Sequence, residues 1–289
     1  MISPSQDASS EGLEQQYLPR EIATEDLQLL RCAYMTLEHP SLAARLSSAI
    51  GTPIETAMEL LPTSWHNKVY SVIETALAKS LSAAVSSLRR QHTVRERKRY
   101  YKGIAAGSGA MGGLFGIPGL LLELPITTTL MLRSIAEIAR AQGENIYQAE
   151  TQAACLQVFA LGGKSETDDA AETGYYGVRF AMSGYMSAAI QHISHHGVSG
   201  HSAPALVNFI QVVAKAFGTT LSQRAATQIL PLVGAAGGAI VNVIFLQHFQ
   251  DMAQAHFTVR RLERKYGQSF IHSQFELFEQ EDQTSFSSR

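Results

Sequence analysis

The carboxylate of Glu123 is the side chain whose surroundings in the sequence most suggest chemistry. It carries the single charge in the thirty residues 103–132, where leucines surround it and Pro125 follows closely. A carboxylate in an apolar environment has a raised pKa and requires a partner, and within a membrane such a group marks a functional site. The alternative is a residue that caps a helix or faces solvent at a helix start. Both interpretations stay open.

A hydrolase, for example a peptidase, is one function that Glu123 could serve. Acid–base catalysis can pair a carboxylate with a histidine, and His248 and His256 lie in or just after a second apolar stretch. A serine nucleophile is not indicated, because His201 occupies the position of the final glycine in a G-x-S-x-G motif. The catalytic residues of such a hydrolase are therefore unknown from the sequence.

A group of histidines gives weak candidates for a metal site. His192 and His196 are four residues apart and share one face of a helix, with His195 and His201 nearby. No HExxH motif is present, and no carboxylate lies at ligand spacing, so a zinc site would depend on imidazoles alone. Solvated histidines at the negative end of a helix dipole are the simpler interpretation. No metal is predicted.

Two glycine-rich motifs resemble phosphate-binding loops. Gly107, Gly109 and Gly112 match G-x-G-x-x-G, but the dinucleotide fingerprint requires a preceding strand and an acidic residue about twenty positions later. Residues 162–165 resemble the end of a P-loop, but Val158 stands where that motif requires glycine. Close helix packing and a helix C-cap explain the two motifs, and no cofactor is predicted.

The elements that must position these side chains are predicted to be helices. Apolar residues recur at helical spacing through most of the chain, and convincing alternating strand patterns are absent. The sequence predicts an all-α fold with one helical domain at residues 21–272, a flexible tail at 1–20 and a polar, acidic, frayed tail at 273–289. The longer helices are expected at residues 64–90, 120–142, 145–161, 175–196, 204–217 and 231–265.

Composition narrows the class of protein further. The 289 residues are 45% hydrophobic and 17% charged, with a net charge of −2. This near-neutral balance argues against a nucleic-acid binder, which would have a strong basic excess. Two cysteines, Cys32 and Cys155, argue against a disulfide framework and fit a reducing cytosol.

Two apolar tracts, at residues 103–132 and 225–250, suggest contact with a membrane. The second contains no Asp, Glu, Lys or Arg, and each exceeds the roughly twenty residues that cross a bilayer. Both are rich in glycines spaced four apart, which lets helices approach closely. These pairs are Gly103/Gly107, Gly109/Gly113, Gly112/Gly116 and Gly234/Gly238. Because Pro118, Gly119 and Pro125 interrupt the first tract, we expect a hairpin that dips into the bilayer, or two core helices.

Basic residues flank both tracts. Such clusters attract anionic lipid by about 1 kcal/mol per residue near the surface, and they favour the cytoplasmic side of a membrane. The residues expected at the membrane surface are Arg95, Arg97, Lys98, Arg99 and Lys102 before the first tract and Arg260 and Arg261 after the second. The alternative is a soluble bundle, whose buried helices can also be apolar all round.

Two long runs resemble the signatures of a known family. Residues 103–145 contain GIAAGSG, then LLLELPITTTLMLRSIAEIA, then QGEN. Residues 229–242 read ILPLVGAAGGAIVN, and AHFTVRRLERKYG follows at 255–267. In this order the runs resemble the central and C-terminal signatures of the EcsC protein family, over roughly residues 64–267. Glu123 stands where an aspartate is expected, which keeps the carboxylate.

The resemblance implies a bacterial, mostly helical protein. The family takes its name from a component encoded beside an ABC transporter, some relatives carry a peptidase label, and no established catalytic residues can be carried over. The positions that map onto the motifs, and are candidate functional residues, are Gly107, Gly113, Glu123, Pro125, Arg133, Pro231, Gly234 and Asn242.

Three functions follow from these observations. The first is a non-enzymatic cytoplasmic protein, peripheral at the inner membrane, that contacts the lipid surface and influences an ABC-transporter-type membrane protein. The second is a hydrolase that uses Glu123 and nearby histidines. The third is a soluble helical scaffold whose apolar tracts form its core. The oligomeric state stays open.

Overall fold

The computed structural model describes residues 22–62, 65–89, 98–161, 174–196, 204–228 and 234–287. These residues are almost entirely helical and contain no strand, which confirms the predicted all-α fold. The helices are α1 (Thr24–Glu38), α2 (Leu42–Ile50), α3 (Ile54–Met58), α4 (Trp65–Arg89), α5 (Lys98–Ala141), α6 (Ala149–Leu161), α7 (Tyr175–His196), α8 (Pro204–Thr227), α9 (Gly234–Tyr266) and α10 (Gln268–Ser287).

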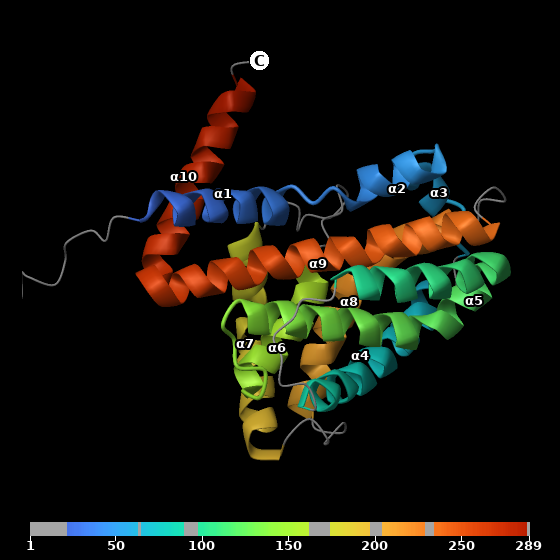
Figure 1. Ribbon diagram of the computed structural model, residues 1–289, viewed down its shortest axis with the longest axis horizontal. Coiled ribbons are helices and arrows are strands. Elements are labelled where there is room, and N and C mark those ends of the chain that lie inside the picture. The colour runs from blue at the N-terminus through green and yellow to red at the C-terminus, as the bar shows by residue number, and fades with distance from the viewer. Residues whose placement is uncertain are drawn as a thin grey trace, which may run out of the picture.

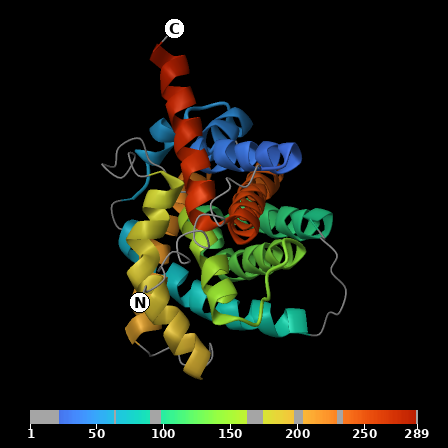
Figure 2. The same cartoon turned by 90° about the vertical axis from the view of Figure 1, so that its left-hand side faces the viewer.

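The long helix α9 is the axis of the fold. It runs across the molecule between α1 and α2 on one side and α5 on the other (Figure 1). Helix α4 packs against α5 and α8, and α6 packs between α7, α8 and α9. Helix α7 crosses the direction of α9, and α10 rises away from the other helices (Figure 2). A shell of helices therefore surrounds the middle of α9.

Four phenylalanines from three helices form the centre of the core. Phe159 of α6, Phe217 of α8 and Phe249 of α9 have ring centroids 4.8–5.4 Å apart, and Phe245 lies 5.2 Å from Phe249. All four are fully buried. Each buried aromatic ring contributes roughly 1.5–3 kcal/mol, and edge-to-face pairs add about 0.5–1.5 kcal/mol. Phe245 and Phe249 are one turn apart, so one face of α9 faces this cluster.

Helix α5 is a hairpin of two arms rather than one straight helix. Gly116 has φ 59° and ψ −144°, which is accessible essentially to glycine alone, and the chain reverses there. The first arm (residues 98–115) and the second arm (117–141) lie side by side, as the bond from Tyr101 Oη to Glu137 Oε1 of 2.7 Å shows. Pro118 lies in the first turn of the second arm, where proline is tolerated. The predicted interruption of the first apolar tract is thus a hairpin.

The second predicted tract is not a single helix. Residues 225–250 cover the last turn of α8 and the first half of α9, and residues 229–233 between them lie outside the described residues. The described helices that are long and apolar enough to cross a membrane are Pro118–Ala141, within α5, and Pro204–Thr227, which is α8. More than half of each is buried inside the fold, as in core helices of soluble proteins, so this is weak evidence for a span.

The C-terminal segment differs from the frayed tail expected at 273–289, because helix α10 continues to Ser287. Phe275 and Phe278, three residues apart, contact Tyr34 of α1 with ring centroids 5.5 and 5.4 Å away. Asp282 accepts a hydrogen bond from Tyr34 Oη at 2.9 Å. These tertiary contacts stabilise a helix that a polar, acidic composition did not predict. The tail predicted at residues 1–20 lies outside the described residues.

Candidate functional site

Glu123 lies at the centre of a buried polar cluster formed by α5, α8 and α9. Its Oε1 accepts hydrogen bonds from Thr127 Oγ1 at 2.7 Å, Asn242 Nδ2 at 2.8 Å and Arg224 Nη2 at 3.0 Å. Its Oε2 accepts a bond from the same Arg224 nitrogen at 3.0 Å. Glu123 is 7% exposed, and Arg224 and Asn242 are 0% exposed. The lone carboxylate of the first tract therefore has a charged partner inside the protein.

Arg224 is held by aromatic and ionic contacts. Its guanidinium lies over the ring of Phe245 at 5.2 Å, a cation–π contact. Burial lowers the pKa of Arg224, and the neighbouring Glu123 carboxylate opposes that shift. The desolvation cost of a buried pair is offset only where the geometry is good and other hydrogen bonds are present. The bonds from Thr127 and Asn242 supply these at the carboxylate.

Asn242 joins both arms of the hairpin to α9. Besides Glu123 on the second arm, its Nδ2 contacts the carbonyl oxygen of Ala105 at 2.5 Å and Ser108 Oγ at 3.0 Å on the first arm. A side chain at Gly109 would not fit, because its Cβ would lie 2.4 Å from Asn242 Cβ and 2.5 Å from the carbonyl oxygen of Gly238. The backbones of α5 and α9 approach closely here, as the glycine spacing predicted.

The structure brings two of the predicted site residues, Glu123 and Asn242, into direct contact. Their partner Arg224 is not among the predicted site residues, although the sequence carries a signal for it: Arg224 is the single Asp, Glu, Lys or Arg between Lys215 and Asp251. The second apolar tract begins at residue 225, one position after Arg224. Two lone and opposite charges in apolar surroundings are expected to pair.

Among the described residues, Gly107, Pro125 and Arg133 form no hydrogen bond with this cluster. Gly107 and Pro125 are exposed, and a Cβ at Gly107 would meet nothing within 4 Å. Arg133 Nε lies 3.9 Å from Glu137 Oε1, a pair one helical turn apart. Gly113 lies in α5 and Gly234 begins α9. Pro231 lies outside the described residues.

The described histidines form neither a metal site nor a catalytic pair with Glu123. No group of three potential ligands is present among the described residues. The rings of His192 and His196 stack with centroids 4.8 Å apart, and His201 lies outside the description. Every hydrogen bond found for the Glu123 carboxylate in the described part of the chain comes from Thr127, Arg224 or Asn242. The pairing that the hydrolase hypothesis needs is therefore not formed.

His256 belongs to a separate buried cluster. Arg179 Nη1 donates to Tyr175 Oη at 3.2 Å, and the same hydroxyl forms a hydrogen bond with His256 Nδ1 at 2.9 Å. The Nε2 of His256 is buried, and no hydrogen-bond partner for it is found among the described residues. Burial lowers the pKa of His256 well below its usual value, and Arg179 and Arg260 add to the shift. This histidine is therefore neutral.

The two predicted basic clusters differ in their surroundings. Lys98 and Arg99 begin the first arm of α5, and Lys102 Nζ donates to Gln247 Oε1 at 3.2 Å. Arg95 and Arg97 lie outside the described residues. In contrast, Arg260 forms ion pairs with Glu144 at 2.9 Å and Glu150 at 2.8 Å. Arg261 lies 3.9 Å from Asp26. The second cluster thus holds elements of the fold together.

The hairpin presents a row of exposed apolar residues. Phe115, Leu122 and Ile126 are 68%, 82% and 58% exposed, and Pro118 and Pro125 between them are also exposed. Their spacing of three to four residues places the four from Pro118 onward on one face of the second arm, with Phe115 at the bend. We call these five residues the apolar stripe. It contains no charge, because the Glu123 side chain points into the cluster with Arg224.

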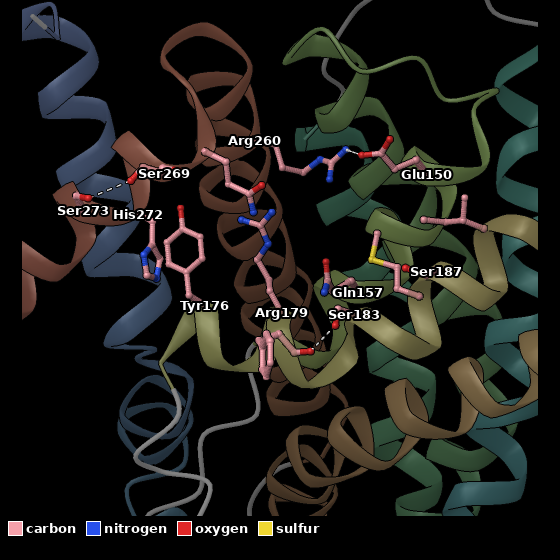
Figure 3. A pocket seen from close by; sticks show the side chains of 14 residues that line it. Glu150, Gln157, Tyr176, Arg179, Ser183, Ser187, Arg260, Ser269, His272 and Ser273 are labelled. Atoms are coloured by element: carbon pink, nitrogen blue, oxygen red, sulfur yellow. Dashed lines mark hydrogen bonds and ion pairs between the residues drawn. The ribbon is translucent and has the colours of Figure 1, made fainter. Parts of the chain in front are cut away.

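A pocket of about 660 Å³ lies between α6, α7, α9 and the first turns of α10. We call it the α7–α10 pocket. Gln157 from α6, Arg179 and Tyr176 from α7, Arg260 from α9 and His272 from α10 line it (Figure 3). No sequence motif predicts this pocket, because its walls come from four segments spread over more than a hundred positions.

Comparison with known proteins finds one family. The model of the EcsC protein family matches residues 30–262, which is most of the chain. Neither the curated proteins nor the solved structures contain a match. The match includes the central signature and the C-terminal one as far as residue 262, with Glu123 and Asn242 inside it. The chain therefore belongs to the EcsC protein family.

Proposed function

We propose that the protein is a membrane-associated accessory protein that contacts lipid through the apolar stripe of the α5 hairpin. The observation that carries this proposal is the exposure of Phe115, Leu122 and Ile126 in a stretch whose one charge is buried. Removing a large apolar side chain from water gains about 1.5–3 kcal/mol. Contiguous apolar surface of this kind is typical of sites that meet a membrane or a partner.

The proposed contact is peripheral rather than spanning. Both arms of the hairpin pack against α9. To span a membrane the hairpin would have to separate from α8, and this would bring the charged Glu123–Arg224 pair into lipid. A charged side chain at the centre of a bilayer is costly. Interfacial helices bury only their outer face, to a depth of roughly 5–10 Å. The stripe suits this mode, and Lys98 and Arg99 on the same hairpin would favour anionic lipid.

The role as accessory to a transport component rests on the family alone. The EcsC resemblance implies a component linked to an ABC transporter, and the described residues contain no catalytic pair around Glu123. We therefore favour a non-enzymatic protein over a hydrolase. The partner at the membrane would be a transporter subunit that meets the same face.

Flotation with lipid vesicles tests the proposal. The full-length protein is mixed with vesicles of phosphatidylcholine, with and without phosphatidylglycerol, and centrifuged through a density gradient. We expect wild type to float, more so with phosphatidylglycerol, and Leu122→Ser/Ile126→Ser to lose at least about fivefold of the bound fraction. The matched control is Leu29→Ser/Leu277→Ser, which removes two leucines exposed by 44% and 48% on α1 and α10.

The outcomes separate the proposed function from its alternatives. Wild type that stays with the soluble fraction in both lipids, or a stripe variant that floats like wild type, contradicts the proposal. The burial of more than half of Pro118–Ala141 and Pro204–Thr227 favours a soluble scaffold as the second candidate. A scaffold would be a stable monomer or oligomer without detergent and would not bind vesicles. Light scattering would measure its oligomeric state.

A further inference from the structure

Three polar side chains along α8 carry buried atoms for which the described part of the chain provides no hydrogen-bond partner. Thr220, Arg224 and Gln228 follow one another at intervals of four residues, on one face of the helix and of the turn that ends it. The atoms concerned are Thr220 Oγ1, Arg224 Nε and Nη1, and Gln228 Oε1. A buried polar atom without a partner is destabilising and calls for an explanation.

Asn242 of α9 adds its Oδ1 to these atoms. Asn242 Nδ2 and Arg224 Nη2 both bind Glu123 Oε1, at 2.8 and 3.0 Å, so the two side chains end at the same carboxylate oxygen. Turning the amide over does not satisfy Asn242 Oδ1. It would place that oxygen against Glu123 Oε1 and the carbonyl oxygen of Ala105, which both accept hydrogen bonds. Asn242 Oδ1 therefore needs a donor of another kind.

Other hydroxyl groups of α8 do have partners. Thr227 Oγ1 donates to the carbonyl oxygen of Arg224 at 2.7 Å, and Ser222 Oγ donates to that of Gly218 at 2.8 Å. Thr227 and Thr220 are both 0% exposed. Burial on α8 therefore does not by itself leave a hydroxyl without a partner.

The unpartnered atoms are a mixture of donors and acceptors. Arg224 offers N–H donors, whereas Gln228 and Asn242 offer acceptor oxygens. The hydroxyl of Thr220 can donate and accept. Because the Glu123–Arg224 pair is neutral as a whole, neither a buried anion nor a buried cation would find its charge balanced here. Water is uncharged and both donates and accepts hydrogen bonds.

We infer that the polar cluster between α5, α8 and α9 binds about two ordered water molecules beside the Glu123–Arg224 pair. A buried water forms about three hydrogen bonds to groups that otherwise have none, and five such atoms on four side chains are present here. The waters hydrate the guanidinium nitrogens that the carboxylate leaves free. They add to the hydrogen bonds that offset the desolvation of the buried pair. This inference is independent of the contact with lipid.

Oxygen-17 magnetic relaxation dispersion of water tests the inference with the full-length protein. It counts the water molecules that stay bound for longer than the protein takes to tumble. Thr220→Val keeps the shape of the side chain and removes the hydroxyl. We expect this variant to lose about one long-lived water. Its Tm should fall by roughly 1–4 °C, because a hydrogen bond to water is lost. In a dry core the same substitution would remove an unpaired hydroxyl and raise Tm.

Thr227→Val is the matched control, because the Thr227 hydroxyl donates to a protein carbonyl. It should lower Tm and leave the number of long-lived waters as in wild type. Glu123→Leu/Arg224→Met replaces the charged pair with apolar side chains and should lose about two of these waters. Vesicle flotation of Thr220→Val should match wild type, which separates this test from that of the lipid contact.

A second measurement needs no variant. In wild type, the Nε–H of Arg224 should show a nuclear Overhauser cross-peak to water. Absence of this cross-peak overturns the inference. An unchanged number of long-lived waters in Thr220→Val, or a higher Tm of that variant, overturns it as well.

Discussion

Glu123 and Arg224 bind each other across 101 positions of sequence, and each is the lone charge of its own apolar stretch. The Arg224 Nη2 atom lies 3.0 Å from both carboxylate oxygens. Their pairing joins the second arm of α5 to α8, and Asn242 adds α9 and the first arm. The functional hypotheses for Glu123 must therefore start from a carboxylate that is already neutralised.

Removal of one member of this pair should destabilise the protein strongly. Glu123→Leu leaves the Arg224 guanidinium buried and unpaired, so we expect the free energy of unfolding to fall by about 3–5 kcal/mol. The double variant Glu123→Leu/Arg224→Met should lose much less than the sum of the single variants. Urea denaturation of all four proteins measures this coupling. Additive losses would show that the two charges do not depend on each other.

Substitution of alanine for two glycines of the first arm should change the stability of the protein in opposite directions. At Gly109 the new Cβ would meet Asn242 Cβ and the Gly238 carbonyl at 2.4–2.5 Å, and one of these is backbone, so we expect a loss of about 1–3 kcal/mol. At Gly107 the Cβ meets nothing, and the higher helix propensity of alanine should stabilise by up to about 1 kcal/mol. Thermal unfolding of both variants provides a matched pair. Equal Tm values would contradict the close approach of α5 and α9.

Stability should fall as the pH decreases through the range where free histidine titrates. His256 is neutral in the folded state because its pKa is well below 6.5, whereas in the unfolded chain it takes up a proton near pH 6.5. Below that pH the unfolded state binds more protons, so unfolding becomes easier, by up to about 1.4 kcal/mol per pH unit. Urea denaturation at pH 7.5 and 5.5, compared between wild type and His256→Phe, isolates this contribution.

The variant provides the control for the histidine prediction. His256→Phe should show a smaller loss of stability between the two pH values than wild type. The carboxyl groups of Asp26, Glu144 and Asp282, whose pKa values are lowered by basic or hydroxyl partners, lose their contribution only at more acidic pH. An identical pH dependence in both proteins would mean that His256 is protonated in the folded state.

The two cysteines should differ sharply in reactivity. Cys32 is exposed, whereas Cys155 is buried and burial raises its thiol pKa to about 12. Because the thiolate is the reactive form, iodoacetamide at pH 8 should modify Cys32 and leave Cys155 intact. Mass spectrometry of the folded protein measures this, and modification of both in urea is the control. Rapid labelling of Cys155 in the native protein would contradict its burial.

Local pattern predicted most helices but not their full extent. The sequence placed a helix at 204–217 and ended it before Gly218, whereas α8 continues to Thr227. Gly218 does not end the helix. It leaves room for Tyr70, whose ring carbon Cε1 would lie 2.5 Å from a Cβ there. The sequence alone could not distinguish a glycine that stops a helix from one that admits a neighbouring ring.

The candidate site was predicted only in part, because it too depends on tertiary contacts that the local sequence does not specify. Glu123 and Asn242 stood out because of their surroundings and their motifs. Their contact, and the role of Arg224, depend on the reversal at Gly116 and on the position of α8. The α7–α10 pocket had no local signal, since each of its four walls is an ordinary helix face.

The bend at Gly116 also has a consequence for the order of folding. It brings Tyr101 and Glu137 together across 36 positions, whereas Arg224 follows Glu123 by 101. Loop closure costs more entropy as the loop lengthens. During synthesis at about 5–20 residues per second, Arg224 emerges roughly 5–20 s after Glu123. A hairpin that formed before α8 was synthesised would have to keep the Glu123 carboxylate hydrated for those seconds, because its counter-ion Arg224 would be missing.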